Sequence, residues 1–500
     1  MQKEFFQKIE RRKKNKKSTI LKCVNSNEGY KQETKLFIQK KGEKMKQKKH
    51  LWINLLLAIM VVVLFTQCAP ASQPASQPAA PSESGGSEEV AAPAEKVKIV
   101  YWSMFSEGEP LMQELDKATK DFMLEYPNIV VEIQWAGRQV LTQLQSAIAA
   151  GTQVDIVDHS DDRVLNAIVK NGLALPMDKY LAEKAYDSDK TWGETFAPGV
   201  LEIGKYEGNT YLIPRDDYIS AFFYNKAIFA EAGIDPKVTG MTWTEFNQLI
   251  ETLETTHPEV TPLGADGNVA FYNNWWFSYL ASRLAGVEAF REAAYDPTGE
   301  KWGEPEFLQA AVLIRELQDK GYFQEGFEGS VWPGAQVQWV NGDVAMMFMG
   351  AWLPKEMSEQ MPEGFEIGLF AFPDVEGGKG NQVVEHWANV YGVLSSTQHP
   401  DEVATYLKYI LSMKVGSGIS SLGVPVPLQG VPVPPALVNQ YVILESSTTI
   451  PARAGLNTEI PEYMDNVFNV CDDQFFTKQI GPEEFINCLK TDSKSYWANK

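Results

Sequence analysis

Cysteine and histidine are scarce in this chain, with four and five residues respectively among 500. A zinc site of the H-E-x-x-H kind needs two histidines four positions apart on one helix. No two histidines lie that close in the sequence; they are His50, His159, His257, His386 and His399. We therefore expect no metal site.

Motifs for catalysis and phosphate binding are missing as well. The sequence has no G-x-S-x-G nucleophile elbow. The glycine-rich stretch 377–380 lacks the spacing and the Ser or Thr of a phosphate-binding loop. Asp187-Ser188-Asp189 has no calcium-loop glycine in register. The sequence thus predicts no catalytic residue, no cofactor and no enzyme activity.

Basic residues are depleted outside the N-terminus. Residues 1–50 hold 17 Lys and Arg and 5 Glu, which leaves 28 basic and 60 acidic residues in 51–500. The net charge of this larger part is about −32. Such a charge keeps a protein soluble and opposes contact with phosphate backbones and anionic lipid surfaces. We expect no nucleic-acid partner.

A short apolar run near the N-terminus ends at a cysteine. Basic residues at 46–50 precede the run Leu51–Phe65, Cys68 follows it, and a tether rich in Ala, Pro and Ser comes next. About fifteen apolar residues suit a signal peptide better than a membrane-spanning helix. The order resembles a bacterial lipoprotein signal, although Gln67 is bulkier than the usual residue before the lipidated cysteine. The alternative is an uncleaved N-terminal anchor.

This pattern divides the chain into four parts. Residues 1–44 precede a normal signal start at Met45 and are interpreted as a wrongly assigned start or a disordered leader. Residues 45–67 are the expected signal peptide, and 68–95 are the lipidated Cys68 with a flexible tether. Residues 96–500 are the expected folded part, held at the extracytoplasmic face of the cell membrane.

Two cysteines remain near the C-terminus. In an exported protein Cys471 and Cys488 can pair. Closing a loop of this length is worth roughly 3 kcal/mol. Two free buried thiols are the alternative.

Hydrophobic periodicity predicts an α/β fold from residue 97 onward. Strands are expected at 97–102, 129–133 and 154–157, with amphipathic helices at 110–126 and 140–150 between them. This alternation indicates a parallel sheet flanked by helices. About 405 residues follow the tether, which suits two lobes. Later strands are expected at 222–224, 344–349, 367–372 and 390–394, helices at 307–320 and 401–413 and after a Thr242 cap, and an irregular loop at 422–435.

Several stretches carry a family resemblance. They are Gly151–Ile156 with Asn171–Asp178, Tyr206–Pro214 with Phe223–Lys226 and Ala232–Ile234, and Asn341–Met347 with Gly350–Trp352. In order and spacing they resemble the family 1 extracellular solute-binding proteins, the sugar receptors of ABC importers that include maltose-binding protein. The resemblance implies a two-lobe type II periplasmic-binding-protein fold, with a hinge and a central ligand cleft. It also implies a monomer that binds a carbohydrate and the transmembrane subunits of an ABC permease, and that reaches the membrane through its lipid anchor.

Polar and aromatic residues recur at the expected strand ends. A sugar has apolar C–H faces and a rim of hydroxyls, so it suits flat aromatic side chains and planar polar groups. The resemblance adds that Asp162-Arg163, Tyr218 and Trp352 occupy positions that face ligand in the family. The expected ligand-binding residues are Trp102, Ser106, Glu107, His159, Asp162, Arg163, Asp217, Tyr218, Asn274, Trp276, Trp352, Glu385 and Trp387.

Other roles stay open for some of these residues. Trp102 suits the core as well as the cleft, and Asp162 and Arg163 could simply cap a helix. We expect Trp276, rather than Trp275, to face the cleft. His159 stands where the sugar receptors often have an aromatic residue.

Two other functions are compatible with the sequence. A surface-anchored glycan hydrolase would need two carboxylates at a fixed separation in the cleft. The same receptor fold could also take a non-sugar ligand, such as a polyamine, a phosphodiester or iron. Iron would favour clustered tyrosines, whereas the expected cleft residues are tryptophans.

Overall fold

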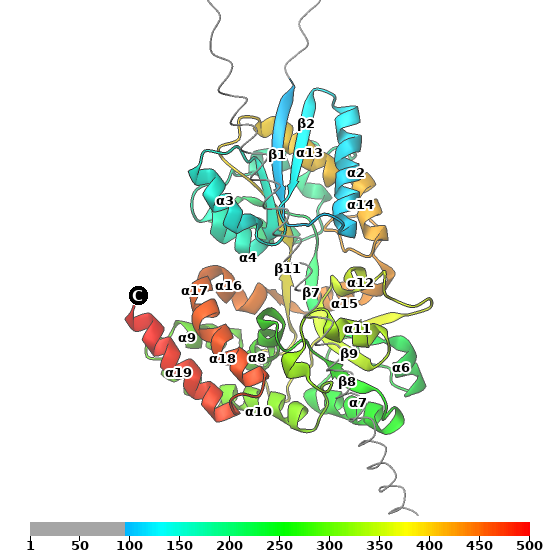
Figure 1. Ribbon diagram of the computed structural model, residues 1–500, viewed down its shortest axis with the longest axis vertical. Coiled ribbons are helices and arrows are strands. Elements are labelled where there is room, and N and C mark those ends of the chain that lie inside the picture. The colour runs from blue at the N-terminus through cyan, green and yellow to red at the C-terminus, as the bar shows by residue number, and fades with distance from the viewer. Residues whose placement is uncertain (1–95) are drawn as a thin grey trace, which may run out of the picture. The chain divides into compact units, whose positions relative to one another are not determined.

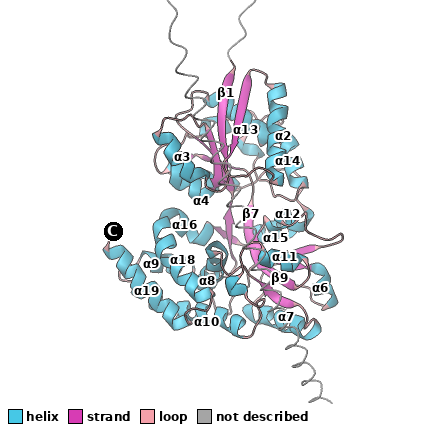
Figure 2. Ribbon diagram, in the orientation of Figure 1, coloured by secondary structure: helices cyan, strands magenta, loops and turns pink. Residues whose placement is uncertain are grey.

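The computed structural model describes residues 96–500. The expected leader, signal peptide, lipidation site at Cys68 and tether lie outside these residues. The chain from Val97 onward folds around two β-sheets flanked by helices (Figures 1 and 2).

The first sheet begins with the predicted strand–helix–strand alternation. Its order is β2-β1-β3-β12-β6. β1 pairs in parallel with both β2 and β3, as expected, whereas β12 runs antiparallel to β3 and β6. The strands are β1 (Val97–Ser103), β2 (Ile129–Trp135), β3 (Ile156–Ser160), β6 (Leu212–Pro214) and β12 (Asn389–Val393).

Five helices belong to the first sheet by their contacts and by their place in Figure 1. α2 buries Leu115, Ala118 and Phe122, the apolar stripe seen in the sequence. The expected helix 401–413 divides in two, because Ser412 accepts a hydrogen bond from the Val415 N–H and caps a second helix. The helices are α2 (Pro110–Glu125), α3 (Val140–Ala149), α4 (Asp161–Val164), α13 (Pro400–Ile410) and α14 (Met413–Ser421).

The second sheet has the order β13-β11-β7-β9-β8, with β10 also paired to β7. Its two central strands are fully buried, which explains their continuous apolar sequences. The predicted strand 222–224 is the middle of the longer β7. The strands are β7 (Tyr218–Asn225), β8 (Thr261–Gly264), β9 (Val344–Gly350), β10 (Ile367–Phe370), β11 (Val383–Trp387) and β13 (Thr448–Ile450). Lys205–Tyr206 (β4) and Asn209–Thr210 (β5) form a separate hairpin.

The helices around the second sheet bury most of the aromatic residues. The predicted cap at Thr242 is present as a full capping box with Glu245. The longer helices are α7 (Trp243–Thr256), α8 (Ala270–Ala285), α9 (Val287–Tyr295), α10 (Pro305–Asp319), α15 (Val438–Ser446), α18 (Asn469–Phe476) and α19 (Pro482–Ala498). The shorter ones are α6 (Lys226–Glu231), α11 (Gly334–Val340), α12 (Leu353–Glu356), α16 (Leu456–Glu459) and α17 (Pro461–Tyr463). One more short helix, α5 (Asp178–Leu181), lies beside the first sheet instead.

Three stretches connect the two sheets. Residues 214–218 lead from β6 to β7, 387–389 lead from β11 back to β12, and 422–437 lead from α14 to α15. The first two are tied together, because the Asp216 carboxylate accepts from the Asn389 backbone and side-chain N–H groups at 2.5 and 2.9 Å. Arg215 donates its backbone N–H to Asn389 O and pairs its buried guanidinium with Asp158 of β3. The first two connecting stretches therefore lie side by side.

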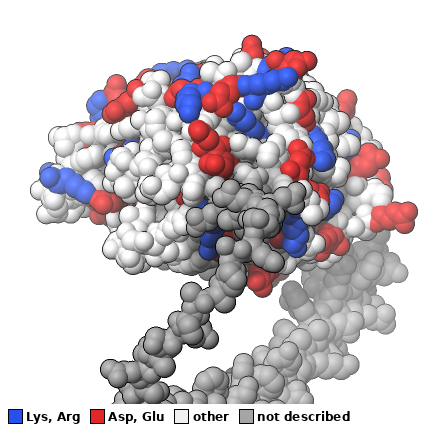
Figure 3. Space-filling view, turned by 90° about the horizontal axis from the view of Figure 1, so that it is seen from above, with Lys and Arg blue, Asp and Glu red and all other residues white. Residues whose placement is uncertain are grey.

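Charged side chains of both signs cover the folded part. Figure 3 shows acidic and basic residues interspersed on the face drawn there, rather than gathered by sign. Most ion pairs join exposed groups, such as Lys98 with Glu132. Such pairs contribute little to stability.

Candidate functional site

The carboxyl ends of β1, β2 and β3 place a group of polar residues at one edge of the first sheet. After β1, Ser106 and Glu107 lie exposed in a loop. After β2, Arg138 pairs with Glu109 of that loop at 2.8 Å and donates to the Met104 carbonyl. In α/β folds ligands bind at this edge of a parallel sheet. Arg138 is therefore a site candidate that the sequence reasoning missed.

His159, in β3, is buried at this edge. Its Nδ1 accepts from the Ser160 N–H at 2.8 Å, and its Nε2 lies 3.3 Å from Arg138 O. These partners fit a neutral ring with the proton on Nε2. Burial lowers the pKa of His159 to about 4, with the positive charge of Arg163 acting in the same direction. His159 is therefore uncharged at neutral pH and holds the Arg138 loop in place.

Asp162 and Arg163 lie in the short helix α4. Asp162 Oδ1 accepts from Ser160 Oγ at 2.6 Å and from the Arg163 N–H at 2.8 Å, and the Arg163 side chain is exposed. Burial lowers the pKa of Arg453, which belongs to the other sheet's side, and the negative charge of Asp162 is among the charges that oppose this shift. The helix start therefore faces the second sheet, and Asp162 has a structural role at this turn in addition to any contact with ligand.

An aromatic cluster follows β9 on the facing side. Trp352 is half-buried and packs against five rings. Their centroid distances from Trp352 are 6.0 Å for Tyr218, 6.3 Å for Phe271, 6.3 Å for Tyr272, 5.8 Å for Trp275 and 5.3 Å for Trp387. The structure thus brings the predicted residues Tyr218, Trp352 and Trp387 together. Phe271 and Tyr272, at the start of α8, were missed because an aromatic run on a helix does not show which members are buried.

Glu385 and Asn274, which we expected to bind ligand, already have hydrogen-bond partners within the protein. The Glu385 carboxylate accepts from Arg453 Nη1 at 2.9 Å, from the Arg453 backbone N–H at 2.8 Å and from Trp275 Nε1 at 2.7 Å. Asn274 Oδ1 accepts from Arg453 Nε at 2.6 Å. All four residues are fully or almost fully buried. Glu385, Asn274 and Arg453 therefore support the aromatic cluster from the core side.

The expectation for Trp276 is wrong in this structure. Trp276 is 2 % exposed and packs among Phe222, Phe323, Phe348 and Phe372 of the core. Its neighbour Trp275 is the one that reaches the Trp352 cluster. Both residues belong to α8, which begins at Ala270, and adjacent side chains of a helix point to different faces. Trp102 is also buried and joins a core cluster with Val140 and Leu144, so the core alternative describes it.

Asp217 lies in the connection between the two sheets. Its carboxylate lies 2.5 Å from His386 Nε2, and its backbone N–H donates to Pro425 O at 3.0 Å. Its carbonyl accepts from Gln440 Nε2 at 2.7 Å. Asp217 therefore touches all three connecting stretches or their flanks, which indicates a hinge role rather than the ligand contact that we expected.

Glu356, at the end of α12, is a further candidate that the sequence reasoning missed. Its Oε1 accepts from Trp332 Nε1 at 3.0 Å, while its Oε2 is buried and has no hydrogen-bond partner among residues 96–500. Burial raises the pKa of Glu356 to about 7, although the Trp332 N–H and the charge of Arg138 oppose the rise. The charge of Arg138, on the first sheet's side, thus acts on Glu356, on the second sheet's side. No sequence signal distinguished Glu356 from the many other acidic residues.

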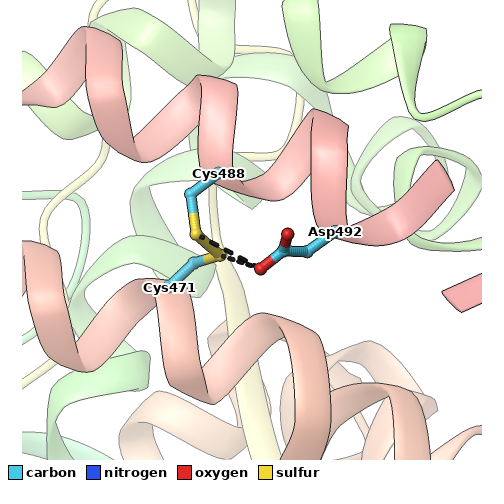
Figure 4. Close-up of side chains that lie close together, drawn as sticks. All are labelled: Cys471, Cys488 and Asp492. Atoms are coloured by element: carbon cyan, nitrogen blue, oxygen red, sulfur yellow. Dashed lines mark hydrogen bonds between the residues drawn. A yellow bond between two sulfur atoms is a disulfide. The ribbon is translucent and has the colours of Figure 1, made fainter. Parts of the chain in front are cut away.

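Cys471 of α18 and Cys488 of α19 form a disulfide, with their Cα atoms 5.9 Å apart (Figure 4). Asp492 Oδ2 lies 3.8 and 3.7 Å from the two sulfur atoms. A disulfide sulfur carries no proton and no thiolate charge, so these contacts are neither hydrogen bonds nor metal ligation. The pair joins two helices beside the second sheet.

Comparison with known proteins gives a family. A model of the bacterial extracellular solute-binding proteins matches residues 105–416, more than half of the chain. The chain is 26% identical to a multiple sugar-binding protein of Streptococcus mutans over 348 residues, which cover 67% of this chain and 76% of that protein. It is 21% identical to an sn-glycerol-3-phosphate-binding periplasmic protein of Brucella abortus, over 64% of this chain and 72% of that protein.

Solved structures share the fold at low sequence identity. A chitin oligosaccharide binding protein matches with a TM-score of 0.67 and 22% identity, over 81% of this chain and all of that one. The raffinose complex of the binding protein RafE matches with a TM-score of 0.65 and 20% identity, over 80% and 99%. The fold is therefore the two-lobe type II periplasmic-binding-protein fold, as predicted. The chain belongs to the bacterial extracellular solute-binding proteins.

Proposed function

We propose that this protein is the lipid-anchored receptor of an ABC importer and that it binds a sugar or oligosaccharide between its two sheets. The supporting observation is Trp352, a half-buried indole among five other rings on one side. Arg138, Asp162 and Arg163 lie on the other side. Aromatic faces suit the C–H faces of a pyranose, and the polar groups suit its hydroxyls.

The relatives point to the same ligand class. One is named as a multiple sugar-binding protein, and one neighbouring structure holds raffinose. A thermal-shift panel of glycans tests the proposal, because a ligand that binds only the folded state raises its apparent stability. We expect at least one neutral or substituted oligosaccharide to raise the melting temperature. A panel without any such ligand would contradict the sugar assignment.

A glycerol phosphate is the competing ligand suggested by the Brucella relative. A phosphate ligand needs free cationic groups. In the described site Arg453 is paired with Glu385 and Arg138 with Glu109, so the exposed Arg163 is the one arginine of the three without an ion pair, and a single guanidinium is a poor match for a doubly charged phosphate. We therefore expect sn-glycerol 3-phosphate, included in the same panel, to leave the melting temperature unchanged.

Binding should close the two lobes. The Asp216–Asn389 contacts and Asp217 hold the connecting stretches together while leaving only short segments between the sheets. Hinge closure around a ligand is a recurring transition of this kind of fold. Small-angle scattering with saturating ligand should show a smaller radius of gyration, and an unchanged curve at proven saturation would indicate a rigid site.

The membrane anchor rests on Cys68, which lies outside the described residues. Among residues 96–500, no helix combines the length and apolarity that crossing a membrane requires. After expression in a bacterium, we expect the protein in the detergent phase with acyl mass on an N-terminal Cys68. A soluble chain cleaved elsewhere would contradict lipidation and would point to Gln67 as the obstacle.

A glycan hydrolase is the second candidate, because Glu356 has the raised pKa of a general acid. A hydrolase also needs a second carboxylate with access to substrate or water. The acidic neighbour Asp266 is fully buried, and its Oδ1 accepts from Ser330 Oγ and from the Ala335 N–H at 2.6 and 2.8 Å. We therefore expect no turnover of a bound oligosaccharide, and shorter products formed in proportion to protein would favour the hydrolase.

A further inference from the structure

The unpartnered carboxylate oxygen of Glu356 lies at the edge of the aromatic cluster. Glu356 is four residues beyond Trp352, in the helix that begins directly after that indole. One oxygen is held by Trp332 Nε1, and the other is inaccessible to solvent and without a partner in the part of the chain that the structure describes. A buried polar group without a partner costs free energy, so a group that meets it on binding gains that energy back.

The surroundings of this carboxyl are aromatic and acidic. Trp332 Nε1 donates to it at 3.0 Å, and the pKa of Tyr272 is raised by burial and then by the charge of Glu356. Asp266 is the other acidic group that acts on it. Trp332 is 52 % exposed, although its indole N–H is engaged. An exposed indole therefore borders this buried carboxylate.

Arg138 carries a positive charge that acts on Glu356, and its guanidinium already has other partners. Its guanidinium meets both oxygens of Glu109, at 3.0 and 2.8 Å, and also donates to Met104 O. Glu356 thus lies among electron-rich rings, and no hydrogen bond or ion pair with a cationic side chain of residues 96–500 holds its carboxylate. Aromatic faces attract cations electrostatically, and a carboxylate adds a charge-assisted hydrogen bond.

From this arrangement we infer that Glu356 selects a ligand bearing a protonated amine, so that the sugar of the proposed function is an amino sugar. The inference rests on the proposed function, because it assigns the chemistry of one position within the same site. The ammonium group would donate to Oε2 and lie against the rings of Trp332 and Trp352. A neutral hydroxyl would also fill the vacant position, but it would gain neither the charge-assisted bond nor the attraction of the rings.

Three disaccharides with one linkage test this assignment by titration calorimetry at pH 6. They are the disaccharide of glucosamine, its N-acetylated form and the corresponding glucose disaccharide. The amine stays protonated at this pH, because amines of this kind titrate near about 7.7. We expect the glucosamine disaccharide to bind up to about 10-fold more tightly than the other two, since a hydrogen bond to a charged group is worth about 1.5–3 kcal/mol and ionising Glu356 one unit below its pKa takes back about 1.4 kcal/mol.

Proton exchange gives a second readout. Because free Glu356 has a pKa of about 7, it is mostly protonated at pH 6 and must ionise to bind an ammonium group. Binding of the glucosamine disaccharide should release up to about one proton, seen as a dependence of the heat on the ionisation enthalpy of the buffer. The neutral disaccharides should release none.

Glu356→Gln is the diagnostic variant and Glu359→Gln is its control. Glu359 lies three residues farther along the chain and is exposed, so its substitution removes the same charge without changing the site. We expect Glu356→Gln to abolish both the preference for the amine and the proton release, while Glu359→Gln keeps both. The melting temperature of each variant without ligand shows that the fold is intact.

The outcomes separate this inference from the proposed function. If a neutral glycan binds and the amine brings no advantage, or if Glu356→Gln weakens all three disaccharides equally, the inference is wrong and the sugar receptor stands. If no glycan of any kind binds, the proposed function fails and the inference fails with it.

Discussion

Arg453 and Glu385 form a buried ion pair at 2.9 Å beneath the aromatic cluster. Arg453 has a left-handed backbone, with φ 49°, and this conformation lets its own N–H reach the same carboxylate. Its guanidinium also lies 4.6 Å from the ring centres of both Phe271 and Trp275. One pair therefore fixes the start of α8, the end of β11 and the turn before α16.

Glu385→Gln should destabilise the fold strongly. Removing one partner of a buried pair leaves an uncompensated charge and costs about 3–5 kcal/mol. Urea unfolding followed by circular dichroism measures the loss. Glu288→Gln is the control, because Glu288 is 85% exposed and its contact with Arg291 is 4.0 Å long; we expect a change of less than about 0.5 kcal/mol. A loss below about 1 kcal/mol for Glu385→Gln would contradict the structural role of the pair.

Trp352→Ala should weaken ligand binding more than it weakens the fold. Aromatic stacking is worth about 0.5–1.5 kcal/mol and the buried apolar area about 1.5–3 kcal/mol. We therefore expect an affinity lower by about one to three orders of magnitude in titration calorimetry. Trp497→Ala removes an indole of α19 that packs on Tyr463, and it should leave affinity unchanged. Unchanged affinity with a sharply lower melting temperature for Trp352→Ala would place Trp352 in the core.

Trp276→Phe should show the opposite behaviour. Truncating a large core aromatic to Ala costs about 3–5 kcal/mol, and Phe removes only part of that volume. We expect a lower melting temperature and an affinity within about twofold of the original, since Trp276 contacts only core residues among its aromatic neighbours. A large loss of affinity with an unchanged melting temperature for Trp276→Phe would show that Trp276 contacts the ligand.

Replacing both Cys471 and Cys488 by Ala should lower the free energy of unfolding without affecting binding. The disulfide spans 17 residues, and closing such a loop is worth about 3 kcal/mol. Peptide mapping without reduction should recover the two cysteines in one linked peptide. Labelling of Cys471 and Cys488 themselves by a thiol reagent after denaturation of the unreduced protein would show that the bond is absent.

The protein should lose stability in acid through His159. The pKa of this histidine is about 4 in the folded chain and about 6.5 when unfolded, so the neutral form is favoured by folding. Its contribution is fully present above pH 6.5 and is lost as the pH falls towards 4, by up to about 3 kcal/mol.

His159→Gln isolates this contribution. Buried acids such as Asp158 and Asp216 have raised pKa values and act in the opposite direction, so the difference between the two proteins is the useful quantity. We expect the stability curves of the original and the variant to converge between pH 7 and 4.5. Parallel curves over this range would mean that His159 titrates normally.

The sequence by itself determined the elements and the family. The periodicity of β1, α2 and β2, the capping box at Thr242 and the apolar run of β9 are local properties, and local patterns survive in the fold. Trp352 could be placed because it directly follows a buried strand and two small residues.

Only the tertiary structure decided which polar and aromatic side chains face each other. Trp275 and Trp276 are adjacent in sequence, yet one joins the Trp352 cluster and the other fills the core, because a helix turns successive side chains by about 100°. The sequence predicted a ligand contact for Glu385, whereas in the fold its carboxylate pairs with Arg453, 68 residues later in the chain. Glu356 became a candidate for the converse reason, since only packing could bury one of its oxygens and leave it without a partner.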